Sequence, residues 1–406
     1  EQELQVHHIV DKFSFIDIVY IINVKYMIII LCLGLSVKKF DSIRPYYDQE
    51  VHDVLINLSN NRRFLKTLLE TDQYRYLKHI PFSRKILSVI LKSKVKNIND
   101  IKSYQDLFEG VVLDVIDNTI NEFSTDGLEN LNPNKAYLFI SNHRDITLDS
   151  ALLNLILHQN KLGTTNNAVG NNLLSEKWAS DLMRLNKSFI IDRSDKSKKD
   201  IYKSLFLASE FIFNSITEKH ESIWIAQKQG RSKDGNDFTD PSVLKMIHLN
   251  GRKRIPLDEY LNNLNVIPVS ISYEKDPNDL TKARELFLTD LNNEYIKEPK
   301  EDLISISEGI RGHKGNVSIS IGSQLNFSTD SYDDAAKLIT DKINELYKIH
   351  PTNIAAAIIQ GKEIPVNDFS ENDLDAAIIY LNERMENIAD EIHPYFLDQY
   401  SNSLNT

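Results

Sequence analysis

The stretch Leu138-Phe139-Ile140-Ser141-Asn142-His143-Arg144-Asp145-Ile146-Thr147-Leu148-Asp149 joins an apolar run to a polar loop that carries one histidine and two aspartates. The next residues, 150–157, form an apolar segment of helical character. A strand that delivers a histidine and an aspartate to the start of a helix is a common way to build an acid/base site. The stretch therefore predicts a strand, a polar loop with a candidate base, and a helix, in that order.

Short apolar runs alternate with helical patterns along the chain on the C-terminal side of this stretch. Such alternation predicts an α/β fold with a sheet flanked by helices, and ligands bind in such sheets at the loops beyond the strand ends. The predicted strands are 136–141, 167–169, 188–191, 222–226, 266–273 and 317–321. The predicted helices between them are 149–159, 175–185, 198–218 and 241–249.

The patterns divide the chain into four predicted parts. They are an apolar extension (1–36), an N-terminal helical subdomain (37–130), an α/β domain (131–330) and C-terminal helices with a tail (331–406). Apolar residues recur at helical spacing through 47–125. Residues 276–312 are charged and irregular, with one helix expected at 280–286. The C-terminal part predicts helices near 331–348, 352–360 and 371–393, followed by a polar tail.

Residues 1–36 are the most apolar segment of the chain. Their uninterrupted apolar run, 26–35, is too short to span a bilayer, and a longer span would bury Lys25 near its centre at high cost. The chain begins with Glu1 and not with methionine. We interpret residues 1–36 as an upstream extension or a misplaced start, with a membrane anchor and an ordinary helix as the alternatives.

Composition narrows the classes of function. The chain has 406 residues, of which 41% are hydrophobic, so it can bury a sizeable core. A net charge of −11 argues against nucleic-acid binding through a broad basic surface, and no nucleic-acid partner is expected. The single cysteine, Cys32, cannot form a disulfide within the chain, which fits a reducing compartment.

His143 is the candidate general base of the opening stretch. A neutral imidazole can accept a proton from a hydroxyl if a carboxylate holds its other nitrogen, and Asp145 and Asp149 both stand close enough in sequence. Asp149 could instead cap the helix that follows. The His143-Arg144-Asp145 triplet is no protein-kinase loop, because Ser150 stands where that loop requires asparagine. No second cluster of histidine and cysteine accompanies it, so no metal site is expected.

Two further strand ends carry arginine. Arg193, followed by Ser194, comes just after the predicted strand 188–191, and Arg231 follows Gly230 after the predicted strand 222–226. The planar guanidinium forms paired, charge-assisted bonds with phosphate, and glycine lets the backbone approach a ligand closely. Each arginine could instead form a surface salt bridge. Together with the histidine loop they predict a hydroxyl to be deprotonated beside a phosphate, as in a phosphorylated alcohol acceptor.

The order of these motifs resembles the glycerol-3-phosphate and lysophosphatidate acyltransferase superfamily over residues 136–290. The stretches 169–173 and Tyr273-Glu274 resemble its bacterial glycerol-3-phosphate branch. The resemblance implies an α/β fold with a mixed sheet flanked by helices. The four matching blocks are Asn142-His143 with Asp149; Phe189-Ile190 with Arg193; Gly230-Arg231-Ser232; and Ile267-Pro268-Val269.

Two departures from the family pattern concern the site itself. Five residues separate His143 from Asp149, where the family has four, so the carboxylate partner is open between Asp145 and Asp149. We favour Asp149 because it leads into the helix, as in the family. Gln229 replaces the glutamate of the third block; it can bond a hydroxyl but cannot take a proton.

The resemblance implies acyl transfer with no metal, no bound cofactor and no covalent acyl-enzyme. His143, oriented by Asp149 or Asp145, would deprotonate a hydroxyl of glycerol-3-phosphate or lysophosphatidate, which attacks the thioester of acyl-CoA or acyl-carrier protein. The implied substrate-binding residues are Asn142, Arg193, Ser194, Lys228, Gln229, Gly230, Arg231 and Ser232, with Lys233 as a further cation near the phosphate.

A lipid product implies a peripheral protein at the cytoplasmic face of a membrane, with the membrane surface as a partner. Two alternatives stay open. One is an acyltransferase for another lipid acceptor, such as an amino-lipid or a saccharide lipid, which Gln229 in place of glutamate allows. The other is a non-catalytic protein on the same fold that binds lipid or acyl-carrier protein.

Overall fold

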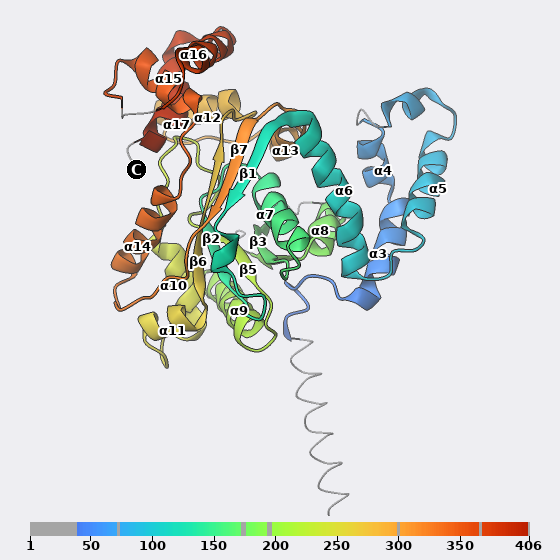
Figure 1. The fold of residues 1–406 in the computed structure, drawn as a ribbon. Helices are drawn as coiled ribbons and strands as arrows, with labels where there is room; N and C mark the ends of the chain where they lie inside the picture. Colours follow the sequence, from blue (N-terminus) through green and yellow to red (C-terminus); the bar gives the residue numbers. More distant parts are fainter. Residues whose placement is uncertain are drawn as a thin grey trace, which may run out of the picture. The chain divides into compact units, whose positions relative to one another are not determined.

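A seven-stranded mixed sheet lies at the centre of the structure, a computed structural model that describes residues 39–70, 74–171, 176–192, 197–298, 301–364 and 368–404. The strand order is β1-β7-β6-β2-β5-β3-β4 (Figure 1). Strands β6, β2, β5, β3 and β4 are parallel, β7 is antiparallel to β6, and β1 is parallel to β7. The strands are β1 Ile120–Asp126, β2 Leu138–Ser141, β3 Asn166–Gly170, β4 Ser188–Ile191, β5 Ile223–Ala226, β6 Val266–Tyr273 and β7 Gly315–Ile321. The predicted mixed α/β class is confirmed.

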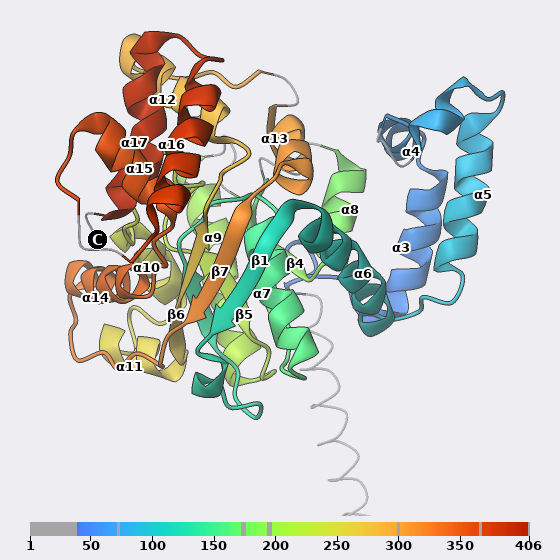
Figure 2. The same ribbon diagram turned by 45° about the horizontal axis from the view of Figure 1, so that its top comes forward.

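The central strands are buried on both faces. All four residues of β2 and all eight of β6 are buried, as the near-continuous apolar runs of these strands predict for a sheet covered on both sides. Helices α6, α7 and α8 lie on one side of the sheet and α10, α11 and α14 on the other (Figures 1 and 2). These helices are α6 Ile101–Thr119, α7 Leu148–Gln159, α8 Lys177–Leu185, α10 Pro241–Ile247, α11 Leu257–Asn263 and α14 Tyr332–Glu345, and α9 Lys198–Thr217 packs against β4 and β5.

The predicted N-terminal helices are present, but the helical region ends earlier than expected. Residues 120–125 were predicted as helix and instead belong to β1, which pairs with β7. The prediction is wrong because an edge strand buries few side chains, so β1 has no apolar run to mark it. The remaining helices of this part are α3 Asp48–Asn60, α4 Arg62–Leu68 and α5 Ser83–Val95, and α3 packs on α8 through Val51 and Trp178.

The chain after β6 differs from prediction in three places. The irregular segment 276–312 contains two helices, α12 Asp279–Asn292 and α13 Glu301–Arg311. The helix expected at 371–393 is shorter in the structure, where α16 spans Glu371–Met385. The expected polar tail is α17 His393–Ser401, whose Phe396 and Tyr400 are buried against α15 Pro351–Gln360 and α16. Its apolar residues are sparse but lie on one helical face, and the many polar residues between them conceal that pattern.

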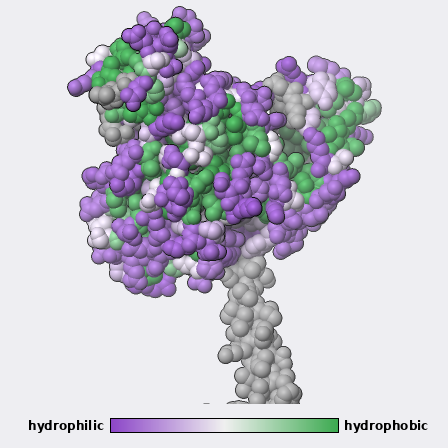
Figure 3. Space-filling view, in the orientation of Figure 1, coloured by the Kyte–Doolittle hydropathy of each residue, from purple (hydrophilic) through white to green (hydrophobic). Residues whose placement is uncertain are grey.

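The surface is mostly hydrophilic, with apolar side chains exposed in places (Figure 3). Val89 on α5 and Val111 on α6 are among them. Over the described residues, no helix has both the length and the apolar character that a membrane crossing requires. Residues 1–36, for which an extension or an anchor was considered, lie outside the described part of the chain.

Candidate active site

His143 and Asp149 form a buried pair at the carboxyl end of β2. The polar loop between β2 and α7 places the histidine, and the first turn of α7 places the aspartate. His143 Nδ1 lies 2.8 Å from Asp149 Oδ2, and the exposed fractions of the two side chains are 15% and 0%. An ionised carboxylate can only accept, so Nδ1 carries the hydrogen and Nε2 is left as the acceptor. Of the two aspartates that the sequence left open, Asp149 contacts the imidazole.

Asp149 also accepts hydrogen bonds from the backbone of the loop and from β6. Its Oδ2 accepts the backbone N–H groups of Arg144 (2.6 Å) and Asp145 (3.1 Å). Its Oδ1 accepts the phenol of Tyr273, at the end of β6, over 2.9 Å. Burial raises the pKa of the Tyr273 hydroxyl well above its ordinary value, so this group remains a donor. Of the five residues between His143 and Asp149, the first two thus turn their N–H groups onto the Asp149 carboxylate.

Asp145 has a different task. Its Oδ1 accepts the backbone N–H groups of Thr147 (2.9 Å) and Leu148 (2.8 Å), at the first turn of α7. The capping role considered for Asp149 is not observed, because Thr147 is the N-cap residue of α7 and the carboxylate of Asp149 is turned back toward the loop. Burial raises the pKa of the Asp145 carboxyl, and the neighbouring charge of Asp149 adds to the shift.

Asn142 is turned into the protein rather than toward the cavity. It is fully buried, its Oδ1 accepts the N–H of Ile271 (2.8 Å), and its Nδ2 donates to the Ile271 carbonyl (2.9 Å). The same Nδ2 donates to Asp237 (3.0 Å). These bonds continue the pairing of β2 with β6 by one residue. Asn142 therefore holds the loop in place and is not among the residues that line the cavity, and its predicted contact with substrate stays a prediction.

Further buried groups hold the loop from behind. Arg144 donates to Asp237 over 2.5 Å, and Lys282 on α12 donates to the Arg144 carbonyl over 2.8 Å. Trp224 on β5 donates its indole N–H to Ser141 Oγ (3.0 Å), and its ring meets that of His143 edge-on, with centroids 5.6 Å apart. Sequence reasoning assigned no role to these residues or to Tyr273. The available signals for Tyr273 were its position at the end of an apolar strand and the resemblance of Tyr273-Glu274 to the bacterial branch of the family.

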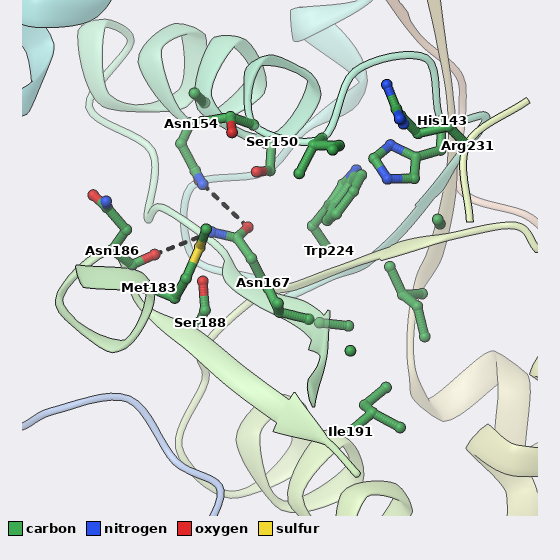
Figure 4. A pocket seen from close by; sticks show the side chains of 18 of the residues that line it. His143, Ser150, Asn154, Asn167, Met183, Asn186, Ser188, Ile191, Trp224 and Arg231 are labelled. Carbon is green, nitrogen blue, oxygen red and sulfur yellow. Dashed lines mark hydrogen bonds between the residues drawn. The ribbon is translucent and has the colours of Figure 1, made fainter. Parts of the chain in front are cut away.

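The segment after β5 carries the third predicted block and is joined to the histidine loop. Ser232 is buried, and its N–H donates to the His143 carbonyl over 2.7 Å. Gly230 has a φ of +78°, which favours glycine, and the space beside its Cα is open. Arg231 lines the same cavity as His143 (Figure 4), and among the described residues its buried Nη1 has no hydrogen-bond partner.

The other predicted substrate-binding residues occupy different positions. Lys228 lines the cavity but donates to the Asn236 carbonyl over 2.7 Å, and burial lowers the pKa of its ammonium group. Lys233 also lines the cavity and donates to Glu285 over 2.5 Å. Gln229 is exposed and lines the cavity. Arg193 and Ser194 lie outside the described residues.

The cavity has a volume of about 750 Å³ and extends from His143 beneath α7 and over β3, β4 and β5. Its lining combines apolar side chains with a smaller number of polar groups, as is typical of pockets for organic ligands. The imidazole of His143 and the guanidinium of Arg231 lie at one end (Figure 4). The arrangement can therefore hold an anion beside a nitrogen base, next to a space for an elongated ligand.

One comparison with known proteins, that with family models, agrees with the resemblance of the motifs. Residues 122–232 match the model of the Acyltransferase family, and this range contains His143, Asp149 and Arg231. A search of curated proteins found no significant match. Among solved structures, the chain is similar to the 1-acyl-sn-glycerophosphate (LPA) acyltransferase PlsC from Thermotoga maritima, with 13% sequence identity and a TM-score of 0.36. That match covers 73% of this chain and 97% of the other.

Proposed function

We propose that the chain is an acyltransferase and that the domain matching the Acyltransferase family model at residues 122–232 acylates a phosphorylated glycerol. The donor would be a thioester of coenzyme A or acyl-carrier protein, and the acceptor glycerol-3-phosphate or lysophosphatidate. One observation carries the proposal: His143, paired with Asp149, lines the same cavity as Arg231, whose buried Nη1 has no hydrogen-bond partner in the described part of the chain. A base and an anion site side by side match an acceptor that has both a hydroxyl and a phosphate.

The proposed reaction needs one proton carrier. His143 Nε2 accepts the proton of the glycerol hydroxyl while the oxygen attacks the thioester carbonyl carbon. Asp149 holds the Nδ1–H and stabilises the imidazolium that forms, as the aspartate of a catalytic triad does. The tetrahedral intermediate then loses the thiolate, which takes the proton from Nε2. An ester and a free thiol result, and the imidazole is neutral again; no metal or bound cofactor takes part.

Arg231 would fix the acceptor through its phosphate. A buried guanidinium nitrogen without a partner is costly, and a phosphate oxygen would satisfy it with a charge-assisted bond. Gly230 leaves room for the phosphate to approach the backbone. Because the products are lipids, we extend the proposal to a peripheral site of action at the cytoplasmic face of a membrane.

Product analysis would test this function directly. The purified full chain would receive isotopically labelled glycerol-3-phosphate and lysophosphatidate together, with acyl-CoA or acyl-carrier protein as donor, and products would be identified by mass spectrometry. We expect ester formation on one of these acceptors and none with His143→Ala. The matched control is His52→Ala, which removes a half-buried histidine whose ring contacts the Ile98 carbonyl on the N-terminal helices. Full activity of His143→Ala would refute the role of His143.

The same assay separates the two alternative functions. Ester formation on a lipid acceptor that lacks phosphate, at equal efficiency, would indicate another acceptor class. Donor binding without turnover would indicate a binding protein. The Gln229→Glu variant should then be compared with wild type on each acceptor, since Gln229 lines the cavity at the position where the family has glutamate.

A further inference from the structure

Helix α13 contacts the site in two places. It lies next to α6 and leads into β7 (Figures 1 and 2). Near its start, Asp302 lines the cavity and accepts a hydrogen bond from Lys297 over 2.6 Å. About two turns further along, Gly309 is buried against the loop between β2 and α7 that carries His143. The same helix therefore forms part of the cavity wall and packs against the histidine loop.

The contact between Gly309 and the histidine loop leaves no space for a side chain. A Cβ atom at position 309 would overlap Oδ2 of Asp145 and would lie 3.0 Å from its Cγ and 3.3 Å from its Oδ1. These three atoms are the nearest to that position, and all belong to the carboxylate of Asp145. Asp145 is only 6% exposed, so its side chain cannot relieve the overlap by turning into solvent.

The carboxylate of Asp145 is held in place by the loop itself. Its Oδ1 accepts the backbone N–H groups of Thr147 and Leu148 over 2.9 and 2.8 Å. Rotation of the carboxylate away from α13 would break these bonds at the first turn of α7, which leaves buried N–H groups without an acceptor. A side chain at position 309 would therefore displace the loop or the helix, rather than the Asp145 carboxylate alone.

Helix α13 is fixed on the same face, so it cannot simply withdraw from the loop. Ser305 is buried one turn before Gly309, and its carbonyl accepts the side-chain N–H of the buried Asn278 over 3.1 Å. Glycine is less favourable than alanine inside a helix, so alanine at position 309 would stabilise α13 if the position were open. The contact with Asp145 reverses the sign expected from helix propensity.

Displacement of Asp145 would reach the proposed base through the backbone. The N–H of Asp145 donates to Asp149 Oδ2 over 3.1 Å, and the same oxygen lies 2.8 Å from His143 Nδ1. A shift of Asp145 thus moves a donor on the carboxylate that orients the imidazole. A misplacement on the order of 1 Å in a catalytic group lowers the rate by about 100-fold, so a small shift at this point is sufficient.

We propose that Gly309 is a positioning residue for the acyl transfer. Its lack of a side chain sets how closely α13 packs against the histidine loop and, through Asp145 and Asp149, how His143 is oriented. This inference rests on the proposed function, and Gly309 itself touches neither substrate nor the reacting atoms. A side chain at this position lowers kcat and leaves KM for the acceptor within a few-fold, because the contact is with the histidine loop and not with the loop that carries Arg231.

A double-mutant cycle in the full chain would test the inference. Gly309→Ala should lower kcat by about 30- to 100-fold. Asp145→Ala removes all three atoms that the new methyl group would meet, so in that background Gly309→Ala should change kcat by less than about threefold. The matched control is Gly110→Ala on α6, another helical glycine, whose Cβ position has nothing within 4 Å. That variant should keep the kcat of the wild type, with an equal or higher thermal midpoint.

The outcomes separate this inference from the proposed function. Equal losses of kcat from Gly309→Ala in the two backgrounds, an unchanged kcat, or a rise in KM alone would overturn the inference and leave the proposed function standing. No acyl transfer by the wild type would refute the proposed function. The cycle read as thermal midpoints then needs no turnover: a midpoint that Gly309→Ala lowers only when Asp145 is present supports the contact, and equal lowering in both backgrounds overturns it.

The double variant keeps the test decisive if Gly309→Ala alone does not fold. Folding of Gly309→Ala with Asp145→Ala, at the kcat of Asp145→Ala, would support the inference, because removal of the carboxylate has then restored what the methyl group disrupted. Failure of the double variant to fold, while Asp145→Ala folds, would overturn it.

Discussion

Two loops at the carboxyl ends of the neighbouring parallel strands β2 and β5 form the site. They differ in how many hydrogen bonds the protein gives to the charged group at the centre of each loop, Asp149 in the first and Arg231 in the second. In the loop after β2, the Asp149 carboxylate accepts hydrogen bonds from the His143 imidazole, two backbone N–H groups and the Tyr273 hydroxyl. In the loop after β5, Gly230 faces open space, and the buried Nη1 of Arg231 has no partner within the residues that the structure describes. The Asp149 carboxylate therefore has its donors without a ligand, whereas among the described residues the Arg231 guanidinium keeps a nitrogen that a bound anion could satisfy.

The difference separates the two tasks of the proposed reaction. A general base must keep its orientation whether or not substrate is present, so its partners are supplied by the protein. A binding residue gains affinity only from bonds that are absent in the free protein. Substitutions in the first loop should therefore lower kcat, and those in the second should raise KM for the acceptor.

Asp149→Asn is expected to have the largest effect on catalysis. The asparagine oxygen can still accept the N–H groups that now bond Asp149 Oδ2, but the neutral amide cannot stabilise the imidazolium that forms on His143 during proton transfer. By analogy with the aspartate of a catalytic triad, kcat should fall by about 10³–10⁴-fold. KM for the acceptor should change little. Steady-state kinetics with each acceptor would measure both values.

Asp145→Asn is the matched control for that variant. The oxygen of asparagine can still accept the Thr147 and Leu148 N–H groups, so the start of α7 is preserved. We expect kcat within a few-fold of wild type. If the two variants lost activity equally, the assignment of Asp149 as the partner of His143 would be refuted.

Arg231→Met should test whether the guanidinium in the second loop binds the phosphate of the acceptor. Loss of a charge-assisted bond to phosphate should raise KM for the phosphorylated acceptor by about 10–100-fold, with a smaller change in kcat. Inorganic phosphate offers a second measurement, because it should raise the thermal midpoint of the wild type and not that of the variant. Arg231→Lys keeps the charge without the planar fork and should lie between the two.

The apolar strands and the order of the site loops could be predicted from the sequence, because both depend on local patterns. Buried runs mark β2 and β6, and polar residues directly after β2 and β5 mark the two loops. Strand β1 was missed because pairing with β7, about 195 residues away, defines it rather than its own composition.

Partners within the site were harder to predict for the same physical reason. Tyr273 reaches Asp149 from 124 positions along the chain. The choice between Asp145 and Asp149 depends on the dihedral angles of one loop, since both lie within reach of His143 in sequence. A resemblance can point to the histidine and the arginine, whereas the roles of the two aspartates require coordinates.

Tyr273→Phe should show how much the hydrogen bond from Tyr273 to Asp149 contributes to catalysis. The substitution leaves Asp149 Oδ1 buried without its donor, which weakens the orientation of the carboxylate. We expect kcat to fall by about tenfold with KM unchanged. Tyr137→Phe is the matched control, since this buried tyrosine bonds the backbone of Asn132 and not the site. Equal losses in both variants would indicate a general effect of a missing hydroxyl on stability.

Lys314 should have the smallest effect on catalysis and a visible one on stability. Its ammonium group is buried and donates to Thr119 Oγ1 (2.8 Å) and to the Gly312 carbonyl (2.6 Å). Burial lowers its pKa from 10.5 to about 8, although the negative charges of Asp145 and Asp276 oppose the shift. Between these two pH values the unfolded chain binds more protons than the folded one. The contribution of Lys314 to the free energy of unfolding therefore rises with pH across this window.

Urea unfolding of wild type and Lys314→Met at several pH values would measure that contribution. The difference in unfolding free energy should move in favour of the wild type as pH rises from 8 to 10.5, with a slope of at most about 1.4 kcal/mol per pH unit. Parallel profiles would show that Lys314 titrates as in the unfolded chain. At pH 7 the variant should retain kcat within about twofold, because no step of the proposed mechanism involves this ammonium group. A large loss of kcat without a loss of stability would show that the charge of Lys314 acts on His143. The hydrogen bonds within the first loop would then be insufficient to explain the reactivity of His143.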